Sequence, residues 1–107
     1  MKTSGIALAL RFAVPPEVIA DFCRRHRVRR LSLFGSVLRD DFRPESDIDI
    51  LVEFEPRAGV GYFGLFDMKE ELGRILGRDV DLQTPMSLSP YFRDRVIREA
   101  VSLYDAA

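Results

Sequence analysis

One short stretch, SDIDILV at residues 46–52, constrains this chain more than any other. Its isoleucines and valine alternate with other side chains, a pattern typical of a β-strand. Side chains alternate between the two faces of a strand, so Asp47 and Asp49 are expected to share one face and the isoleucines the other. Strands usually avoid Asp. The stretch therefore predicts a strand from Asp47 to Phe54 that carries two neighbouring carboxylates.

The composition fits one ordinary domain. The chain has 107 residues, 47% hydrophobic and 31% charged, and we expect a single domain over 1–107 with its core between about Val14 and Tyr104. Lys and Arg number 16 against 17 Asp and Glu, so the net charge of −1 gives no overall attraction to nucleic acid or anionic membranes. One Cys and one His exclude a disulfide framework within the chain, a cysteine-based zinc site and a multi-histidine metal site.

The first residues, MKTSGIALALRF, contain a lysine and a short apolar run that ends at Arg11. That run is shorter than a typical signal-peptide core, and no cleavage site follows it. No apolar stretch reaches the ~20 residues that a membrane helix needs. We therefore expect a cytoplasmic protein with no membrane partner.

Two helices can be recognised in the first three quarters of the chain. Pro15-Pro16 is a plausible helix start, and apolar residues at helical spacing continue to about His26. A second amphipathic helix is expected from Tyr62 to about Gly77. Its apolar stripe consists of Leu65, Met68, Leu72, Ile75 and Leu76.

Strands and a last helix complete the pattern. RRLSLFG, residues 29–35, predicts a strand followed by a short helix or turn over 36–41, and RDVDLQT, residues 78–84, predicts another strand. A last helix is expected from about Pro90. Its apolar face would consist of Phe92, Val96, Ile97, Ala100, Val101 and Tyr104. The order helix, strand, short helix, strand, helix, strand, helix indicates an α/β (α+β) domain in which helices flank a small mixed sheet.

The two carboxylates of the central strand need an explanation. Like charges this close disfavour one another unless a cation lies between them, and Mg2+ prefers oxygen ligands. The alternative is that the Asp47 and Asp49 face is simply solvated at the rim of the sheet. Asp81, in a neighbouring strand, would supply a third carboxylate. Asp79 shares its face, but we favour Asp81 because it lies within the apolar run. Three such carboxylates could hold two metal ions.

Gly35-Ser36 follows a strand at the start of a helical segment. Glycine allows the backbone to approach a phosphate closely, and the Ser36 hydroxyl can donate a hydrogen bond. An ordinary turn is the alternative, because Gly-Ser is common in turns. Beside a carboxylate pair, however, a phosphate site gains a role: the phosphate would bind the amides, and a metal ion would bridge it to the carboxylates.

The segment LFGSVLRDDFRPESDIDILVEF resembles the minimal nucleotidyltransferase (MNT) family, within the DNA polymerase beta-like superfamily. The shared pattern is an apolar strand, Gly-Ser, ten residues (37–46), Asp-x-Asp, and a later VDL around Asp81. The resemblance covers about Val14 to Tyr104. It implies the polymerase beta-like fold and the transfer of a nucleoside monophosphate, AMP from ATP in the first instance, to a hydroxyl group with release of pyrophosphate.

The resemblance also implies roles for individual residues. Asp47 and Asp49 would bind both Mg2+ ions, and Asp81 would complete the second metal site and help to activate the nucleophile. The nucleotide would be held by Gly35, Ser36, Arg39 and Ser46. Arg39 on an exposed short helix could equally be solvated. This chain has Leu38-Arg39-Asp40 where relatives often have Ala-Arg-Gly, and Asp40-Asp41 adds negative charge beside the expected triphosphate.

A chain of this length has no room for a domain that binds the acceptor. Free-standing MNT proteins resemble the antitoxin of two-protein modules, in which the MNT protein attaches AMP to a HEPN-domain ribonuclease toxin. The resemblance implies the same partner here. Two alternatives remain open: a non-catalytic MNT-fold module that neutralises a partner by occlusion, and the catalytic subunit of a small-molecule nucleotidyltransferase.

Two further groups of residues have more than one interpretation. The aromatic residues Tyr62, Phe63 and Phe66 could form a partner surface, but we favour the core. The basic cluster consists of Arg24, Arg25, His26, Arg27, Arg29 and Arg30. It could contact nucleic acid, but we favour a solvated helix end.

Overall fold

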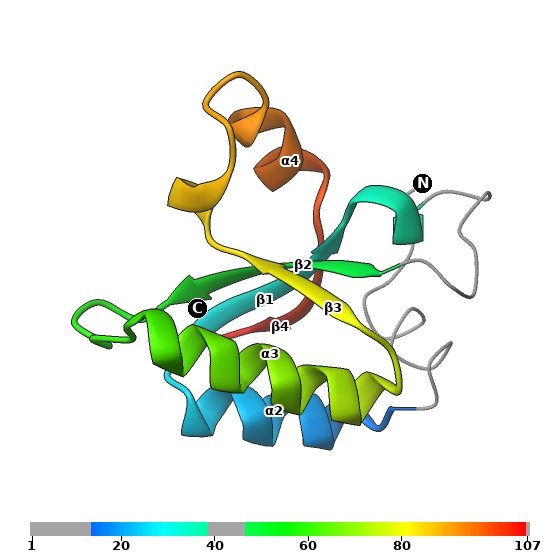
Figure 1. Cartoon of the computed structure of the whole chain (residues 1–107), viewed down its shortest axis with the longest axis vertical. Helices are drawn as coiled ribbons and strands as arrows, with labels where there is room; N and C mark the ends of the chain where they lie inside the picture. Colours follow the sequence, from blue (N-terminus) through cyan, green and yellow to red (C-terminus); the bar gives the residue numbers. More distant parts are fainter. Residues whose placement is uncertain (1–13, 39–46, 107) are drawn as a thin grey trace.

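The computed structural model describes residues 14–38 and 47–106. Its centre is a four-stranded sheet with strand order β3-β2-β1-β4 (Figure 1). The elements in chain order are α2 (Pro16–Arg25), β1 (Val28–Phe34), η1 (Gly35–Leu38), β2 (Ile48–Phe54), α3 (Tyr62–Leu76), β3 (Val80–Gln83), η2 (Pro85–Ser87), α4 (Arg93–Glu99) and β4 (Val101–Asp105). The predicted fold class, helices flanking a small mixed sheet, is confirmed.

The sheet is mixed in direction. Strand β1 is antiparallel to both β2 and β4, whereas β2 and β3 are parallel and are joined by α3. A parallel pair requires such a crossover connection. As a result, the end of β1 and the beginnings of β2 and β3 lie at the same edge of the sheet.

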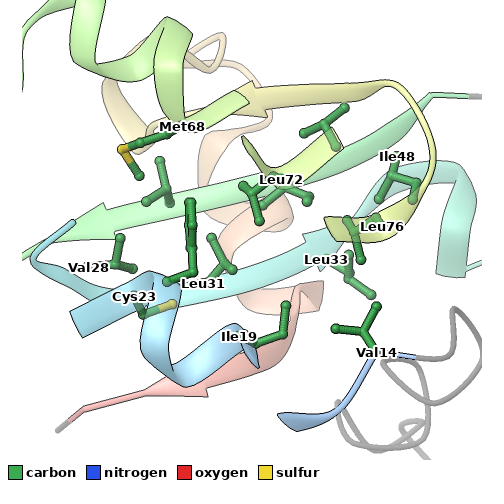
Figure 2. Close-up of a cluster of buried hydrophobic side chains, with 14 residues drawn as sticks. Val14, Ile19, Cys23, Val28, Leu31, Leu33, Ile48, Met68, Leu72 and Leu76 are labelled. Carbon is green, nitrogen blue, oxygen red and sulfur yellow. The ribbon is translucent and has the colours of Figure 1, made fainter. Parts of the chain in front are cut away.

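The helices cover the sheet on both faces. Helices α2 and α3 lie side by side on one face, and α4 lies on the other (Figure 1). Beneath α2 and α3 is the larger core, in which residues such as Ile19, Leu31, Leu33 and Leu72 are fully buried (Figure 2). A smaller cluster on the α4 face is centred on Leu51, Leu88 and Ala100. Strand β2 contributes to both clusters and is therefore buried on both faces.

Two predicted helices are confirmed with close boundaries. Helix α2 has a proline in its first turn, where a missing N–H costs nothing, and it ends one residue before His26. Helix α3 ends at Leu76. Gly77 follows in the left-handed conformation with φ 68°, and its N–H donates to the Gly73 carbonyl. Glycine terminates helices in this way because it carries no Cβ.

The last predicted element is partly wrong. Helix α4 ends at Glu99, and Val101–Asp105 forms strand β4, paired with β1. Ala100 already has extended backbone angles, φ −61° and ψ 142°. Beyond it, Val101 and Leu103 alternate with polar or aromatic residues, so the apolar spacing changes from helical to strand-like. The exposed edge of β1 needs hydrogen-bond partners, and β4 supplies them.

The aromatic residues at the start of α3 are also not where we predicted them. The exposed fractions of Tyr62, Phe63 and Phe66 are 82%, 83% and 53%. They belong to the surface and not to the core. No helix in the described part of the chain is long and apolar enough to span a membrane.

Ion pairs connect the end of α2 to the middle of α3. Arg25 donates to Glu71 and also, at 2.9 Å, to Asp21, and His26 Nε2 lies 2.9 Å from Glu71 Oε1. Arg29 Nη2 lies 3.4 Å from a Glu53 oxygen. Part of the basic cluster is thus engaged with carboxylates of the same chain.

The contacts of Glu71 predict a dependence of stability on pH. The Arg25 hydrogen bond is the main reason that the pKa of Glu71 is lowered, with a smaller contribution from His26. A carboxyl group whose pKa is lowered by folding stabilises the fold above its unfolded pKa, and this contribution is lost as the pH falls through the folded value. We expect the stability advantage of the wild type over Glu71→Gln to shrink below about pH 4.5. Urea unfolding at several pH values measures it. Glu70→Gln, the same change on the exposed neighbouring residue, is the control, and an advantage that persists in acid would contradict the prediction.

Cys23 gives a second prediction. It is fully buried on α2, and burial raises the pKa of its thiol to about 12. Because the thiolate is the reactive form, the folded protein should react with Ellman's reagent at pH 8 far more slowly than a free thiol. Addition of urea should release one reactive thiol per chain. Rapid reaction without denaturant would show that α2 opens easily.

Candidate active site

The candidate site lies where β1 ends and β2 and β3 begin. In the register of the sheet, Asp49 of β2 lies opposite Phe34 of β1 on one side and opposite Asp81 of β3 on the other. Residues opposite one another in neighbouring strands point to the same face. The two carboxylates are therefore direct neighbours, although they are separated by the whole of α3 in the sequence.

Gly35 brings the backbone against the Asp49 carboxylate. Its φ is 73°, in the left-handed region that side chains other than glycine rarely adopt. A Cβ atom at this position would lie 2.3 Å from Asp49 Oδ2 and 3.2 Å from its Cγ. Only glycine fits, both for its backbone angles and for the space. The first residue of η1 and the Asp49 carboxylate are thus in close contact.

Asp81 lies in the wall of a shallow pocket of about 250 Å3. Gln83 Nε2 donates a hydrogen bond of 2.8 Å to Asp81 Oδ1. The pocket is also lined by Phe34, Gln83, Ser87, Leu88, Ser89 and Phe92. The carboxylate therefore faces a space that is partly apolar and that opens on the α4 side of the sheet.

Asp47 lies two residues before Asp49, at the entrance to β2. It precedes the first residue of β2, is exposed, and lines a different pocket of about 300 Å3 together with Lys69, Glu70, Asp79 and Val80. The carbonyl of Asp79 accepts the hydrogen bond from the Ile48 N–H at 2.9 Å that opens the β2–β3 ladder. Among the described residues, the structure brings together Asp49 and Asp81, and no group of three acidic, His or Cys side chains is placed to hold a metal ion.

The remaining predicted site residues are only partly described. The backbone of Ser36 lies in η1, directly after Gly35. Arg39, Asp40, Asp41 and Ser46 lie outside the described residues. One site residue was missed in the sequence: Gln83, which binds Asp81. Its position two residues after Asp81 in the same strand was the available signal, because such residues share a face.

Comparison with known proteins shows the family of this chain. The family model described as "Nucleotidyltransferase domain" matches residues 16–103. The chain belongs to this family. It is a nucleotidyltransferase, and the resemblance seen in the sequence is confirmed.

Two relatives and two solved structures illustrate the relationship. The nucleotidyltransferase is 43% identical to a "Putative protein adenylyltransferase" of Methanocaldococcus jannaschii over 74% of this chain and 83% of the relative. It is 38% identical to the protein adenylyltransferase MntA of Thermococcus cleftensis over 72% of this chain and 76% of the relative. A solved "putative minimal nucleotidyltransferase" superposes with a TM-score of 0.70 at 34% identity, covering 92% of this chain and 95% of the other.

The second structure is more distant. It contains a tri-AMPylated Shewanella oneidensis HEPN toxin in complex with an MNT antitoxin. The TM-score is 0.60 at 24% identity, with 84% of this chain and 69% of the other covered. At this identity the likeness is one of fold.

The donor set of the nucleotidyltransferase fits a hard divalent cation. Mg2+ in enzymes is usually held by one or two carboxylates, and substrate phosphates and water supply the other ligands. Asp49 and Asp81 provide two neighbouring carboxylates, and the backbone at Gly35 lies close against the first of them.

The contact between Gly35 and Asp49 gives the prediction for this site. Gly35→Ala and Gly77→Ala both place a Cβ on a residue with φ near 70°, but a Cβ at Gly77 has no other atom within 4 Å. Gly77→Ala should cost about 1–2 kcal/mol of folding free energy and leave nucleotide binding unchanged. Gly35→Ala should also displace the Asp49 carboxylate and weaken binding of Mg-ATP about tenfold or more. Urea unfolding and calorimetric titration separate the two effects. Equal ATP affinities in the two variants would contradict the role of Gly35.

Proposed function

We propose that this nucleotidyltransferase is a protein adenylyltransferase: with Mg2+, it transfers AMP from ATP to a hydroxyl group of a partner protein. The observation that carries the proposal is the in-register pair of Asp49 and Asp81 against Gly35. The names of the relatives described above agree with it. The single buried cysteine is compatible with the cytoplasm, where we propose that the protein acts.

Each residue of the site would have its own role in binding or catalysis. The backbone at Gly35 and Ser36 would hold the triphosphate, and Asp49 and Asp81 would hold the cation. Bound Mg2+ neutralises phosphate charge and acidifies a coordinated hydroxyl group. The acceptor oxygen forms a bond to the α-phosphorus, the bond from that phosphorus to the bridging oxygen breaks, and pyrophosphate leaves. The proton of the hydroxyl group passes to Asp81, which lines the open pocket.

The partner we propose is a HEPN-domain ribonuclease, which makes this chain the antitoxin of a two-protein module. The Shewanella oneidensis complex, whose MNT antitoxin shares this fold, supports the proposal. A toxin carrying AMP in that complex is also the product expected of the proposed reaction. Nothing in the described part of this chain forms a separate acceptor domain, so the acceptor surface would come from the partner.

A non-catalytic role is the second candidate, and one observation favours it. Tyr62, Phe63 and Phe66 form an exposed aromatic surface on α3 that a bound partner could cover. A module of this kind would neutralise its partner by occlusion. Its action would not depend on the carboxylates.

Replacement of one carboxylate tests both candidates. We expect Asp49→Asn to lower the rate of AMP transfer by about a hundredfold or more, because it removes a negative charge from the cation site. The assay incubates the purified protein with ATP, Mg2+ and the HEPN-domain ribonuclease of the same genome. The readouts are the mass gain of the toxin and its ribonuclease activity.

Asp67→Asn is the matched control, since Asp67 is an exposed residue of α3. It should transfer AMP at the wild-type rate. If the toxin is neutralised without gaining mass, and Asp49→Asn neutralises it equally well, the occlusion module replaces the enzyme.

A further inference from the structure

A chain of hydrogen bonds leads from Asp81 to the η2 segment. Gln83 Nε2 donates to Asp81 Oδ1 at 2.8 Å, and Ser87 Oγ donates to Gln83 Oε1 at 2.7 Å. Ser87 also lies in a reciprocal capping box with Thr84. The Thr84 N–H donates to Ser87 Oγ at 2.9 Å, and the Ser87 N–H donates to Thr84 Oγ1 at 3.3 Å.

The hydrogen bonds determine which way the Gln83 amide points. An ionised carboxylate can only accept hydrogen bonds, so it requires the NH2 group of Gln83. The amide oxygen then faces Ser87. The Ser87 hydroxyl has two acceptors within reach, and the Gln83 oxygen is nearer than the Thr84 carbonyl at 2.9 Å. Rotation of the amide by 180° would place two acceptors against each other at Asp81. Ser87 therefore stabilises the one orientation that can donate to Asp81.

The η2 segment, which carries Ser87, is itself held in place by α4. Arg93 of α4 donates from Nε to the Pro85 carbonyl at 2.6 Å and from Nη2 to the Leu88 carbonyl at 3.0 Å. One guanidinium group thus hydrogen-bonds to the backbone at both ends of the short η2 segment. Ser87 is consequently fixed relative to α4 as well as to β3.

The geometry points to Gln83 as a positioning residue: oriented by Ser87, it fixes the rotation of the Asp81 carboxylate beside Asp49 for cation binding and AMP transfer. This inference rests on the proposed function. Partners that orient a metal-binding side chain typically contribute about ten- to a hundredfold to metal affinity or activity. Asp81 lies at the wall of an open pocket, where an unrestrained carboxylate could rotate.

The test uses Gln83→Met, which keeps a side chain of similar length and removes the donor. At saturating Mg2+ we expect kcat for AMP transfer to fall about tenfold or more while KM for ATP stays within about twofold, because the triphosphate is held at Gly35. Binding of Mn2+, followed by the loss of its free electron paramagnetic resonance signal, should weaken in parallel. Ser87→Ala should move both readouts in the same direction by a smaller factor, and Ser87→Thr, which keeps the hydroxyl group, should restore them.

Thr84→Ala is the matched control. It removes one hydrogen bond of the same capping box but leaves the contact between Ser87 and Gln83. If it lowers kcat as much as Ser87→Ala does, the effect comes from folding of η2 and the inference is overturned. Wild-type kcat and Mn2+ affinity in Gln83→Met would also overturn it.

Failure of the Gln83 inference is distinguishable from failure of the proposed function. If the wild type transfers no AMP but binds Mn2+ more tightly than Gln83→Met does, adenylylation is rejected and the positioning of Asp81 stands. If the wild type does not bind Mn2+ at all, both are rejected.

Discussion

Everything in the site depends on the pairing of β2 with a strand on each side. The antiparallel ladder to β1 places Asp49 beside the end of that strand, and the parallel ladder to β3 places it beside Asp81. Apolar residues of β2 are buried on both faces, Ile50 under α2 and α3 and Leu51 under α4. A register slip by one residue would exchange these faces and is therefore strongly disfavoured. The same packing that stabilises the sheet thus holds the carboxylate in place.

The close approach of Gly35 to Asp49 is the second constraint on the proposed site. A loop with any larger residue at this point would have to move away from Asp49, because the Cβ would overlap a carboxylate oxygen. Backbone and carboxylate can share the site only because the side chain is a single hydrogen. A phosphate and a cation need these two kinds of group side by side. The proposed site for Mg2+ and triphosphate therefore depends on Gly35 as well as on the carboxylate pair.

Residue spacing predicted the helices and strands whose formation depends on residues close together in the sequence. The stripe of α3 and the glycine that ends it were clear from spacing alone. Strand β4 was missed because Val101 and Tyr104 also fit the helical spacing that begins in α4, and the change to strand-like alternation is short; pairing with the open edge of β1 favours the strand. The start of α3 was misjudged for a related reason. Tyr62 and Phe63 are apolar enough for the core, but spacing alone does not show which side of the first turn of α3 meets the sheet, and both are exposed.

By itself, the sequence determined the family, the central strand with its carboxylates, and the pairing of Gly-Ser with Asp-x-Asp and a later Asp, because these are patterns of residue type and spacing. The tertiary structure decided which carboxylates meet. Asp49 and Asp81 are neighbours through strand register, whereas Asp47 directly precedes β2 and lines a pocket together with Asp79. It also decided that Gln83 and Ser87 hold Asp81. The physical reason is that such contacts depend on the register between strands and on the path of the chain between them, which residue spacing does not encode.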